Sequence, residues 1–86
     1  MNIIELIAIV KKKIKAKILI EDIEVEDKSY LHTNHSGNQP DKFHIKIKIK
    51  SNELKKMRRI DSNKIIYSIL NEEMKHSIHS LQILIC

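Results

Sequence analysis

The chain has little of the residues that break, cross-link or stack a fold. Its 86 residues include one glycine, one proline, one cysteine, one phenylalanine and two tyrosines. A single glycine, Gly37, excludes a glycine-rich phosphate loop and the Gly-x-x-Gly clamp that some nucleic-acid-binding modules use. A single cysteine, Cys86, excludes an internal disulfide and a Cys-x-x-Cys motif, which is typical of a reducing compartment. We therefore expect a cytoplasmic protein.

Long hydrophobic runs are also lacking. The apolar run from Ile3 to Val10 is interrupted by Glu5 and is followed by three lysines, the reverse of the order in a secretory signal. It is far too short to cross a bilayer. The chain also has no nucleophile, base and carboxylate at a recognisable spacing, and no cofactor fingerprint. These absences predict a protein that is neither embedded in a membrane nor an enzyme.

Apolar residues recur at two periods along the chain. Spacings of three and four over the first fifteen or so residues, from Ile3 to Ile14, predict an amphipathic helix. Alternation with polar residues predicts strands from about Lys17 to Glu26, from Phe43 to Lys50 and from Ile78 to Ile85. In the second of these strands the alternation yields one apolar face and one face that carries His44 and lysines. His44 is therefore expected to be solvated.

Two further helices are expected between the second and third strands. The stretch from Asn52 to Ile60 is basic and predicts a short helix. Asp61 or Ser62 is a suitable N-cap for the next helix, which should end near His76. The order helix, strand, strand, helix, helix, strand predicts one α+β domain over residues 1–86, with the helices on one face of a three-stranded sheet. The other face would be open and cationic.

Two stretches carry a resemblance to the BolA family. They are Val25-Glu26-Asp27-Lys28-Ser29-Tyr30-Leu31-His32 and Ile65-Ile66-Tyr67-Ser68-Ile69-Leu70-Asn71-Glu72-Glu73-Met74, the latter followed by Ile78-His79. The resemblance spans about residues 18 to 85 and implies a BolA-like fold, similar to the class II KH type. Where the family commonly has Phe, Gly and Arg-His-Arg, this chain has Leu54, Lys56 and Ser62-Asn63-Lys64. Leu54 should still fill a core position.

The resemblance also implies a metal site. In the family, the histidine at the start of the last strand is a ligand of a two-iron two-sulfur (2Fe-2S) cluster shared with a monothiol glutaredoxin, and His79 matches it. His32, in the pattern Asp27-x-Ser29-x-x-His32, matches the second ligand, for which His35 is an alternative. The glutaredoxin partner supplies its own cysteine and glutathione. The resemblance thus implies an adaptor, monomeric when alone, in cluster trafficking or in iron and redox regulation.

Other interpretations of the histidines remain open. In a small basic chain most histidines are solvated, and without the resemblance His79 has the parity of a residue at the edge of the core. The pairs His32-x-x-His35 and His76-x-x-His79 have plausible spacing for zinc. His76 alone would also suit the negative end of a helix. Cys86 is a possible thiol ligand, although a chain terminus positions a ligand poorly.

A DNA-binding regulator is the alternative function. The net charge is +5, and the segment from residue 52 to 74, which resembles a helix-turn-helix, carries a basic cluster typical of phosphate binding. The cluster consists of Lys55, Lys56, Arg58, Arg59 and Lys64. Phe43 and Tyr67 are expected inside, so there is no aromatic platform for single strands. The pattern favours weak, salt-sensitive DNA binding.

Overall fold

The structure is a computed structural model, and it describes residues 2–29 and 42–86. Within these ranges the chain forms helices and strands in the expected order, except that one expected helix is divided in two. The elements are α1 (Ile3–Lys17), β1 (Asp22–Asp27), β2 (Phe43–Lys50), α2 (Asn52–Lys55), α3 (Arg59–Ile69), α4 (Asn71–His76) and β3 (Ile78–Ile85).

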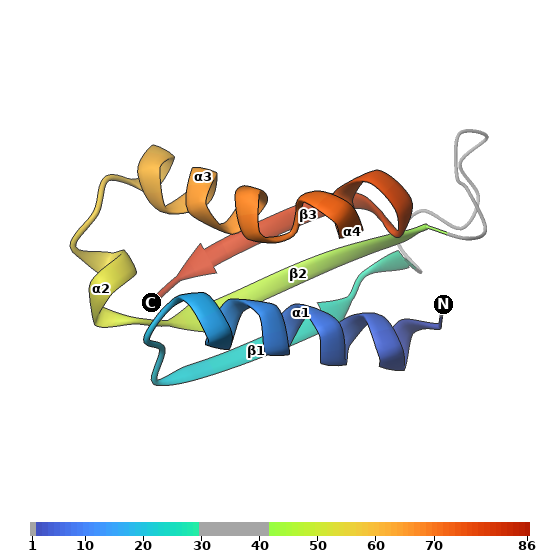
Figure 1. The fold of residues 1–86 in the computed structure, drawn as a ribbon, viewed down its shortest axis with the longest axis horizontal. Coiled ribbons are helices and arrows are strands. Elements are labelled where there is room, and N and C mark those ends of the chain that lie inside the picture. Colours follow the sequence, from blue (N-terminus) through green and yellow to red (C-terminus); the bar gives the residue numbers. More distant parts are fainter. Residues whose placement is uncertain (1, 30–41) are drawn as a thin grey trace.

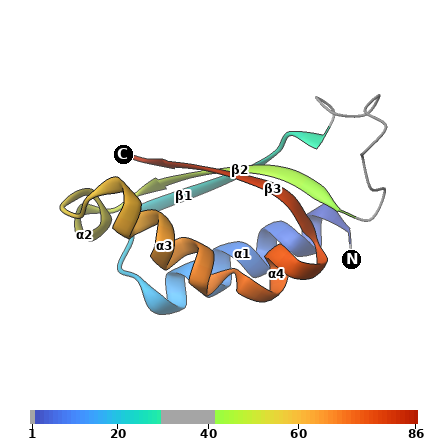
Figure 2. The same ribbon diagram turned by 90° about the horizontal axis from the view of Figure 1, so that it is seen from above.

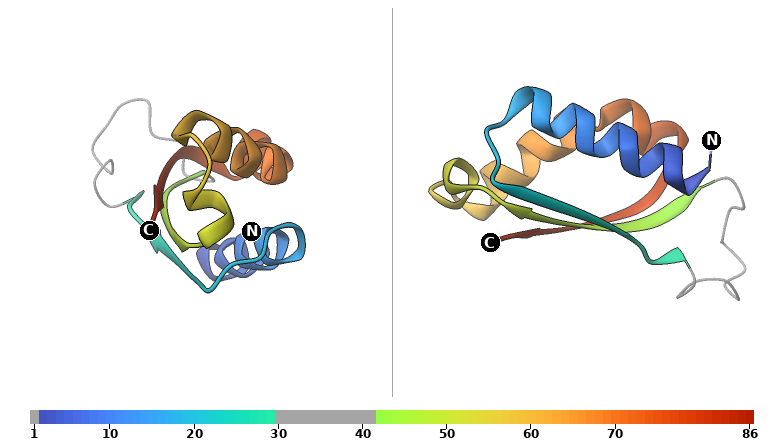
Figure 3. Two further views of the ribbon diagram at one scale, coloured as in Figure 1. Left: turned by 90° about the vertical axis from the view of Figure 1, so that its left-hand side faces the viewer. Right: turned by 90° about the horizontal axis from the view of Figure 1, so that it is seen from below.

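The sheet has the order β1-β2-β3, with β2 antiparallel to β1 and parallel to β3 (Figure 1). Figures 2 and 3 show the helices on one side of the sheet, with α1 beside α3 and α4. Figure 1 shows the long axis of the molecule running along the strands, and the extents are 39 × 22 × 19 Å. The predicted α+β architecture, with helices on one face of a three-stranded sheet, is therefore confirmed. No helix among the described residues is both long and apolar enough to span a bilayer.

The core lies between the helices and the sheet. Burial of apolar side chains in this core supplies the main favourable free energy of folding. Leu54 is 1% exposed, which confirms its predicted core position. The buried apolar residues are Leu6, Val10, Ile14, Ile18, Ile23, Ile45, Ile47, Ile49, Leu54, Ile66, Leu70, Ile78 and Ile83.

One ion pair joins two helices next to this core. The Lys13 ammonium on α1 donates to Glu73 Oε2 on α4 at 2.7 Å. The Glu73 residue is only 8% exposed, and its other carboxylate oxygen, Oε1, is buried without a hydrogen-bond partner in the described part of the chain. The pair therefore ties α1 to the helix that leads into β3.

The first strand begins later than its alternation predicts. The strand expected from Lys17 starts only at Asp22, because α1 continues to Lys17 and the amide of Ile18 donates to the Ile14 carbonyl at 3.0 Å. Lys15 and Lys17 in the last turn favour this extension, since cations stabilise the negative end of a helix. Ile18, expected on a strand, is instead buried at the end of the helix.

The helix expected from Asp61 or Ser62 to His76 differs in two ways. It begins at Arg59, because the Arg58 guanidinium binds the Asp61 carboxylate (2.8 and 3.3 Å) and the Ser62 hydroxyl donates to the Arg59 carbonyl (3.0 Å) instead of capping an N-terminus. The helix is also divided at Leu70, whose backbone leaves the helical region, although its end at His76 agrees with the prediction.

The open face of the sheet is charge-paired, so the prediction of a cationic face was wrong. The register sets each outward lysine of β2 beside a carboxylate residue of β1. These pairs are Asp22 with Lys50, Glu24 with Lys48, and Glu26 with Lys46. Opposite charges directly across a strand pair attract one another, and here they neutralise the face. Sequence parity assigned the lysines to this face, but the register determines their partners.

The pKa of the Glu26 carboxyl is lowered by nearby lysines. The Lys28 ammonium lies 2.8 Å from Glu26 Oε2. Its hydrogen bond and charge lower the pKa of Glu26 from the ordinary value of 4.5, with smaller contributions from Lys46 and Lys48. Because the folded-state pKa is the lower one, the contact stabilises the fold above the ordinary pKa. That contribution disappears as the pH falls through the folded-state pKa.

Replacing Lys28 with alanine should therefore raise the pKa of Glu26 toward 4.5. The measurement is an NMR titration of the side-chain carboxyl carbon. Lys50→Ala is the matched control, because Lys50 lies opposite Asp22 at the other end of β1 and should change the pKa of Glu26 much less. If Lys28→Ala leaves that pKa unchanged, Lys28 does not bind Glu26 in solution.

Candidate functional site: a histidine pair at the start of the last strand

The start of β3 contains an irregularity that exposes His79. Phe43 pairs with Ile78 and His44 pairs with Ser80, so one step along β2 corresponds to two steps along β3. His79 is the extra residue of this bulge. A bulge redirects the side chain that it carries, and His79 is exposed although the parity of the strand would assign it to the edge of the core. The bulge thus presents an imidazole to solvent at a fixed point of the sheet.

The ring of His79 packs against a second histidine. The centroids of the His44 and His79 rings are 4.6 Å apart and their planes are inclined by 34°, within the range in which aromatic rings contact one another. The Nδ1 atom of His44 lies 2.6 Å from the Ser80 hydroxyl oxygen, a hydrogen bond whose direction depends on the tautomer of the ring. The residue after His79 therefore orients the ring on which His79 packs.

The backbone of His44 is anchored to the end of β1. The His44 amide donates to the Ser29 hydroxyl at 3.1 Å, and the His44 carbonyl accepts from the Lys28 amide at 2.7 Å. Ser29 is itself held by a hydrogen bond from its amide to Asp27 Oδ1 at 2.9 Å. Asp27 and Ser29, noted in the sequence only as parts of a pattern, thus have a structural function. They fix His44 at the point where the chain leaves β1.

The expectation that His44 is solvated was wrong. Its residue exposure is 6%, and its Nε2 atom is buried. Alternation along β2 does assign His44 to the parity of the outward lysines. It cannot show that Ser80 and His79 lie beside it, because that depends on the register between β2 and β3. Ser80, the polar residue beside His44, is 36 residues away in the sequence, so no local pattern signals this contact.

The remaining predicted ligands are not assembled by the described residues. His32 and His35 lie outside the described ranges. His76 lies in the last turn of α4, as predicted. Its side chain is exposed, and its Nε2 atom is 3.6 Å from Glu72 Oε2 on the same helix. Cys86 follows the far end of β3. Within residues 2–29 and 42–86, no three His, Cys, Asp or Glu side chains are grouped so that they could hold a metal ion.

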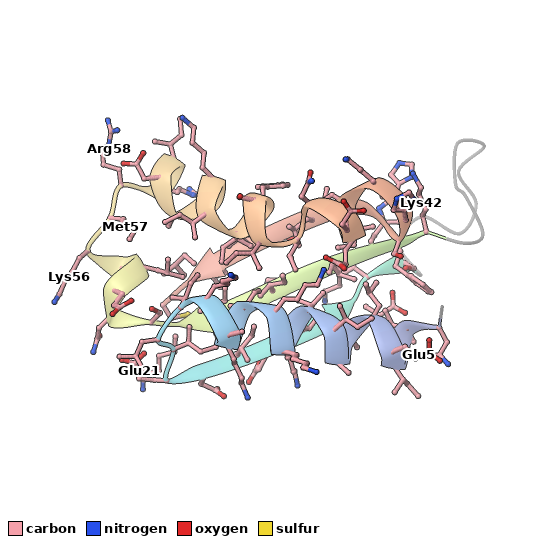
Figure 4. All side chains as sticks on the ribbon, viewed as in Figure 1. Glu5, Glu21, Lys42, Lys56, Met57 and Arg58 are labelled. Atoms are coloured by element: carbon pink, nitrogen blue, oxygen red, sulfur yellow. The ribbon has the colours of Figure 1, made fainter. Side chains whose placement is uncertain are left out.

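The predicted basic cluster and the histidine pair lie toward opposite ends of the molecule. Figure 4 shows Lys56 and Arg58 at one end, and Lys42, which directly precedes β2, toward the other. The side chains of the cluster are all exposed, and Arg58 also binds Asp61. Tyr67 is 41% exposed, not inside as expected, and its hydroxyl donates to the Leu81 carbonyl at 3.1 Å. The two candidate surfaces are therefore separate.

Comparison with known proteins places the chain in a family. Residues 14–85 match the family model described as BolA-like protein. Over 73 residues the chain is 34% identical to the DNA-binding transcriptional regulator BolA of Haemophilus influenzae, with 85% of this chain and 68% of that protein covered.

Solved structures are similar over nearly the whole chain. The BolA domain of SufE1 from Arabidopsis thaliana has a TM-score of 0.78 and 26% identity, over 93% of this chain and 88% of that one. BolA1 from the same plant has a TM-score of 0.77 and 26% identity, over 92% and 87%. Residues 14–85, which match the family model, include the strands that carry His44 and His79. This chain belongs to the BolA family.

Proposed function

We propose that this protein is a non-enzymatic adaptor that uses His79 to complete a 2Fe-2S cluster shared with a monothiol glutaredoxin. The observation that carries the proposal is the exposed His79 imidazole, presented by a bulge and packed on a buried histidine. Imidazole can replace thiolate on one iron of such a cluster. The cluster would supply the redox and exchange chemistry, and the protein would supply a ligand and a docking surface.

The donor set fits a shared cluster better than a cluster held by this chain alone. Iron–sulfur clusters need thiolates, and the one thiol, Cys86, is seven residues from His79 along an extended strand. That separation is about 23 Å at the rise of a β-strand, too far for one cluster. Thiolates must therefore come from a partner, and an exposed imidazole is accessible to one.

The second ligand is proposed to be His32, with His35 as the alternative. Ser29 holds the backbone of His44, and the His44 ring contacts that of His79. His32 follows Ser29 by three residues, a span of at most about 11 Å. This anchoring supports a ligand pair formed by His79 and a residue that follows β1. His35 follows Ser29 by six residues, a span of at most about 22 Å.

Anaerobic titration of the purified chain into a cluster-loaded monothiol glutaredoxin tests this proposal. We expect a changed visible circular dichroism spectrum and a one-to-one complex by size-exclusion mass, because an imidazole replaces a ligand of the cluster. The apo-glutaredoxin is the control for binding without the cluster. An unchanged spectrum with no complex contradicts the proposal.

DNA binding is a second candidate, located on the exposed basic cluster at the other end of the molecule. Its support is the grouping of these cations around the α2–α3 junction, together with the name of the Haemophilus influenzae relative. Lysine and arginine bind phosphates by releasing counterions, so such binding would weaken steeply with salt. Regulation of transcription would then be the biological role.

Charge reversal separates the two candidates. If the cluster binds DNA, Arg58→Glu with Arg59→Glu should remove most of the affinity and reduce the slope of log K against log salt by about 1 per lost phosphate contact. The measurement is a fluorescence-anisotropy titration of duplex DNA at several salt concentrations. Lys12→Glu, on the exposed face of α1, is the single-charge control. Equal losses per reversed charge in the two proteins would indicate an effect of net charge without a defined surface.

A further inference from the structure

We propose that His44 is a positioning residue that holds the His79 imidazole in one orientation, an inference that rests on the proposed function of His79 as a ligand. The Nε2 atom of His44 is buried. His44 would therefore act on the site through the ring of His79. Among the described residues, the His44 ring packs against the His79 ring, with the ring centroids 4.6 Å apart and the planes inclined by 34°.

The position of His44 is itself determined on three sides. Ser29 and Lys28 hold its backbone from β1, and the Ser80 hydroxyl holds Nδ1 from β3 at 2.6 Å. The first two contacts come from the end of β1, and the third comes from Ser80, the residue after His79 on β3. A ring held in this way is a rigid surface, whereas the exposed His79 ring has solvent on its other side. The contact therefore limits the rotamers available to His79.

Orientation matters for a ligand on an exposed bulge. A free side chain samples several staggered rotamers, and the loss of this freedom opposes binding. Groups that orient a metal ligand typically contribute 10–100-fold to metal affinity. We therefore expect loss of the His44 ring to weaken the cluster-bridged complex by roughly tenfold or more, without removing a ligand.

Three variants test the proposal. His44→Leu removes the ring and its hydrogen bond while filling much of the volume. His44→Phe keeps a ring against His79 but loses the bond to Ser80. Ile83→Ala, on the same strand and 9% exposed, lowers stability four residues away from His79 and controls for a merely structural effect.

The first readout uses the apo-protein. NMR three-bond couplings report the χ1 rotamer populations of His79. We expect one dominant rotamer in the wild type, His44→Phe and Ile83→Ala, and averaging over rotamers in His44→Leu. An unchanged rotamer population in His44→Leu overturns the proposal, whatever the cluster does. If His44→Leu does not fold, loss of the single rotamer in His44→Phe would overturn the ring contact as its cause.

The second readout is the affinity for cluster-loaded monothiol glutaredoxin. His44→Leu should bind roughly tenfold more weakly or worse, and His44→Phe should bind nearly as the wild type does. Equal affinity of wild type and His44→Leu, with averaged His79 rotamers, overturns a positioning role in ligation. If no protein binds the cluster, the proposed function fails, while the apo-protein couplings still decide whether His44 orients His79.

Discussion

His79→Ala should abolish the cluster-bridged heterodimer with a monothiol glutaredoxin. The substitution removes a direct ligand, so its effect should exceed the loss of about 100-fold that removal of an outer positioning group can cause. The imidazole is exposed, so its removal leaves no cavity and should change the free energy of unfolding little. The measurement is visible circular dichroism of the cluster together with the mass of the complex.

His76→Ala is the matched control for this experiment. His76 is also exposed, and it lies three residues earlier on α4, where its partner is Glu72. We expect His76→Ala to form the complex with the wild-type spectrum. DNA affinity should be unchanged in both variants, because the basic cluster lies at the other end of the molecule. If His79→Ala keeps the wild-type cluster spectrum, His79 is not a ligand.

Lys13→Met should produce a large loss of stability, although Lys13 lies outside the apolar core. It leaves the Glu73 carboxylate, in a residue only 8% exposed, without the ammonium that now lies 2.7 Å away. Glu73 Oε1 already has no hydrogen-bond partner among the described residues. An uncompensated buried charge costs several kcal/mol, and we expect a decrease of about 3 kcal/mol in the free energy of unfolding. Lys13 is itself 39% exposed, which favours the lower end of the usual range.

Urea unfolding followed by far-ultraviolet circular dichroism measures this change. The double variant Lys13→Met with Glu73→Met should recover most of the loss, because paired apolar replacements avoid the desolvation of both charges. Lys12→Met, at an exposed position of the same helix, should change stability by no more than about 0.5 kcal/mol. Equal stability of the Lys13→Met and Lys12→Met proteins would mean that the Lys13–Glu73 pair does not stabilise the fold.

The outcomes at Leu54, His44 and Asp61 show which kind of prediction a sequence supports. Leu54 is in the core as expected, because an apolar side chain at a helical position needs only a neighbour that excludes water. Asp61 or Ser62 was expected to cap a helix, but Asp61 binds Arg58 and the Ser62 hydroxyl donates to the Arg59 carbonyl. Local propensity does not distinguish between two partners that are equally near in the chain.

The sequence by itself determined the type and order of the elements, because apolar periodicity follows from the geometry of each helix or strand alone, but it did not predict the division of one expected helix at Leu70. Its resemblance to a family also predicts His79 as a ligand, which stays a prediction. The tertiary structure decided the rest. It neutralised the open face of the sheet and buried His44 against His79 and Ser80. Both results depend on strand register, which joins residues far apart in the chain and leaves no local pattern.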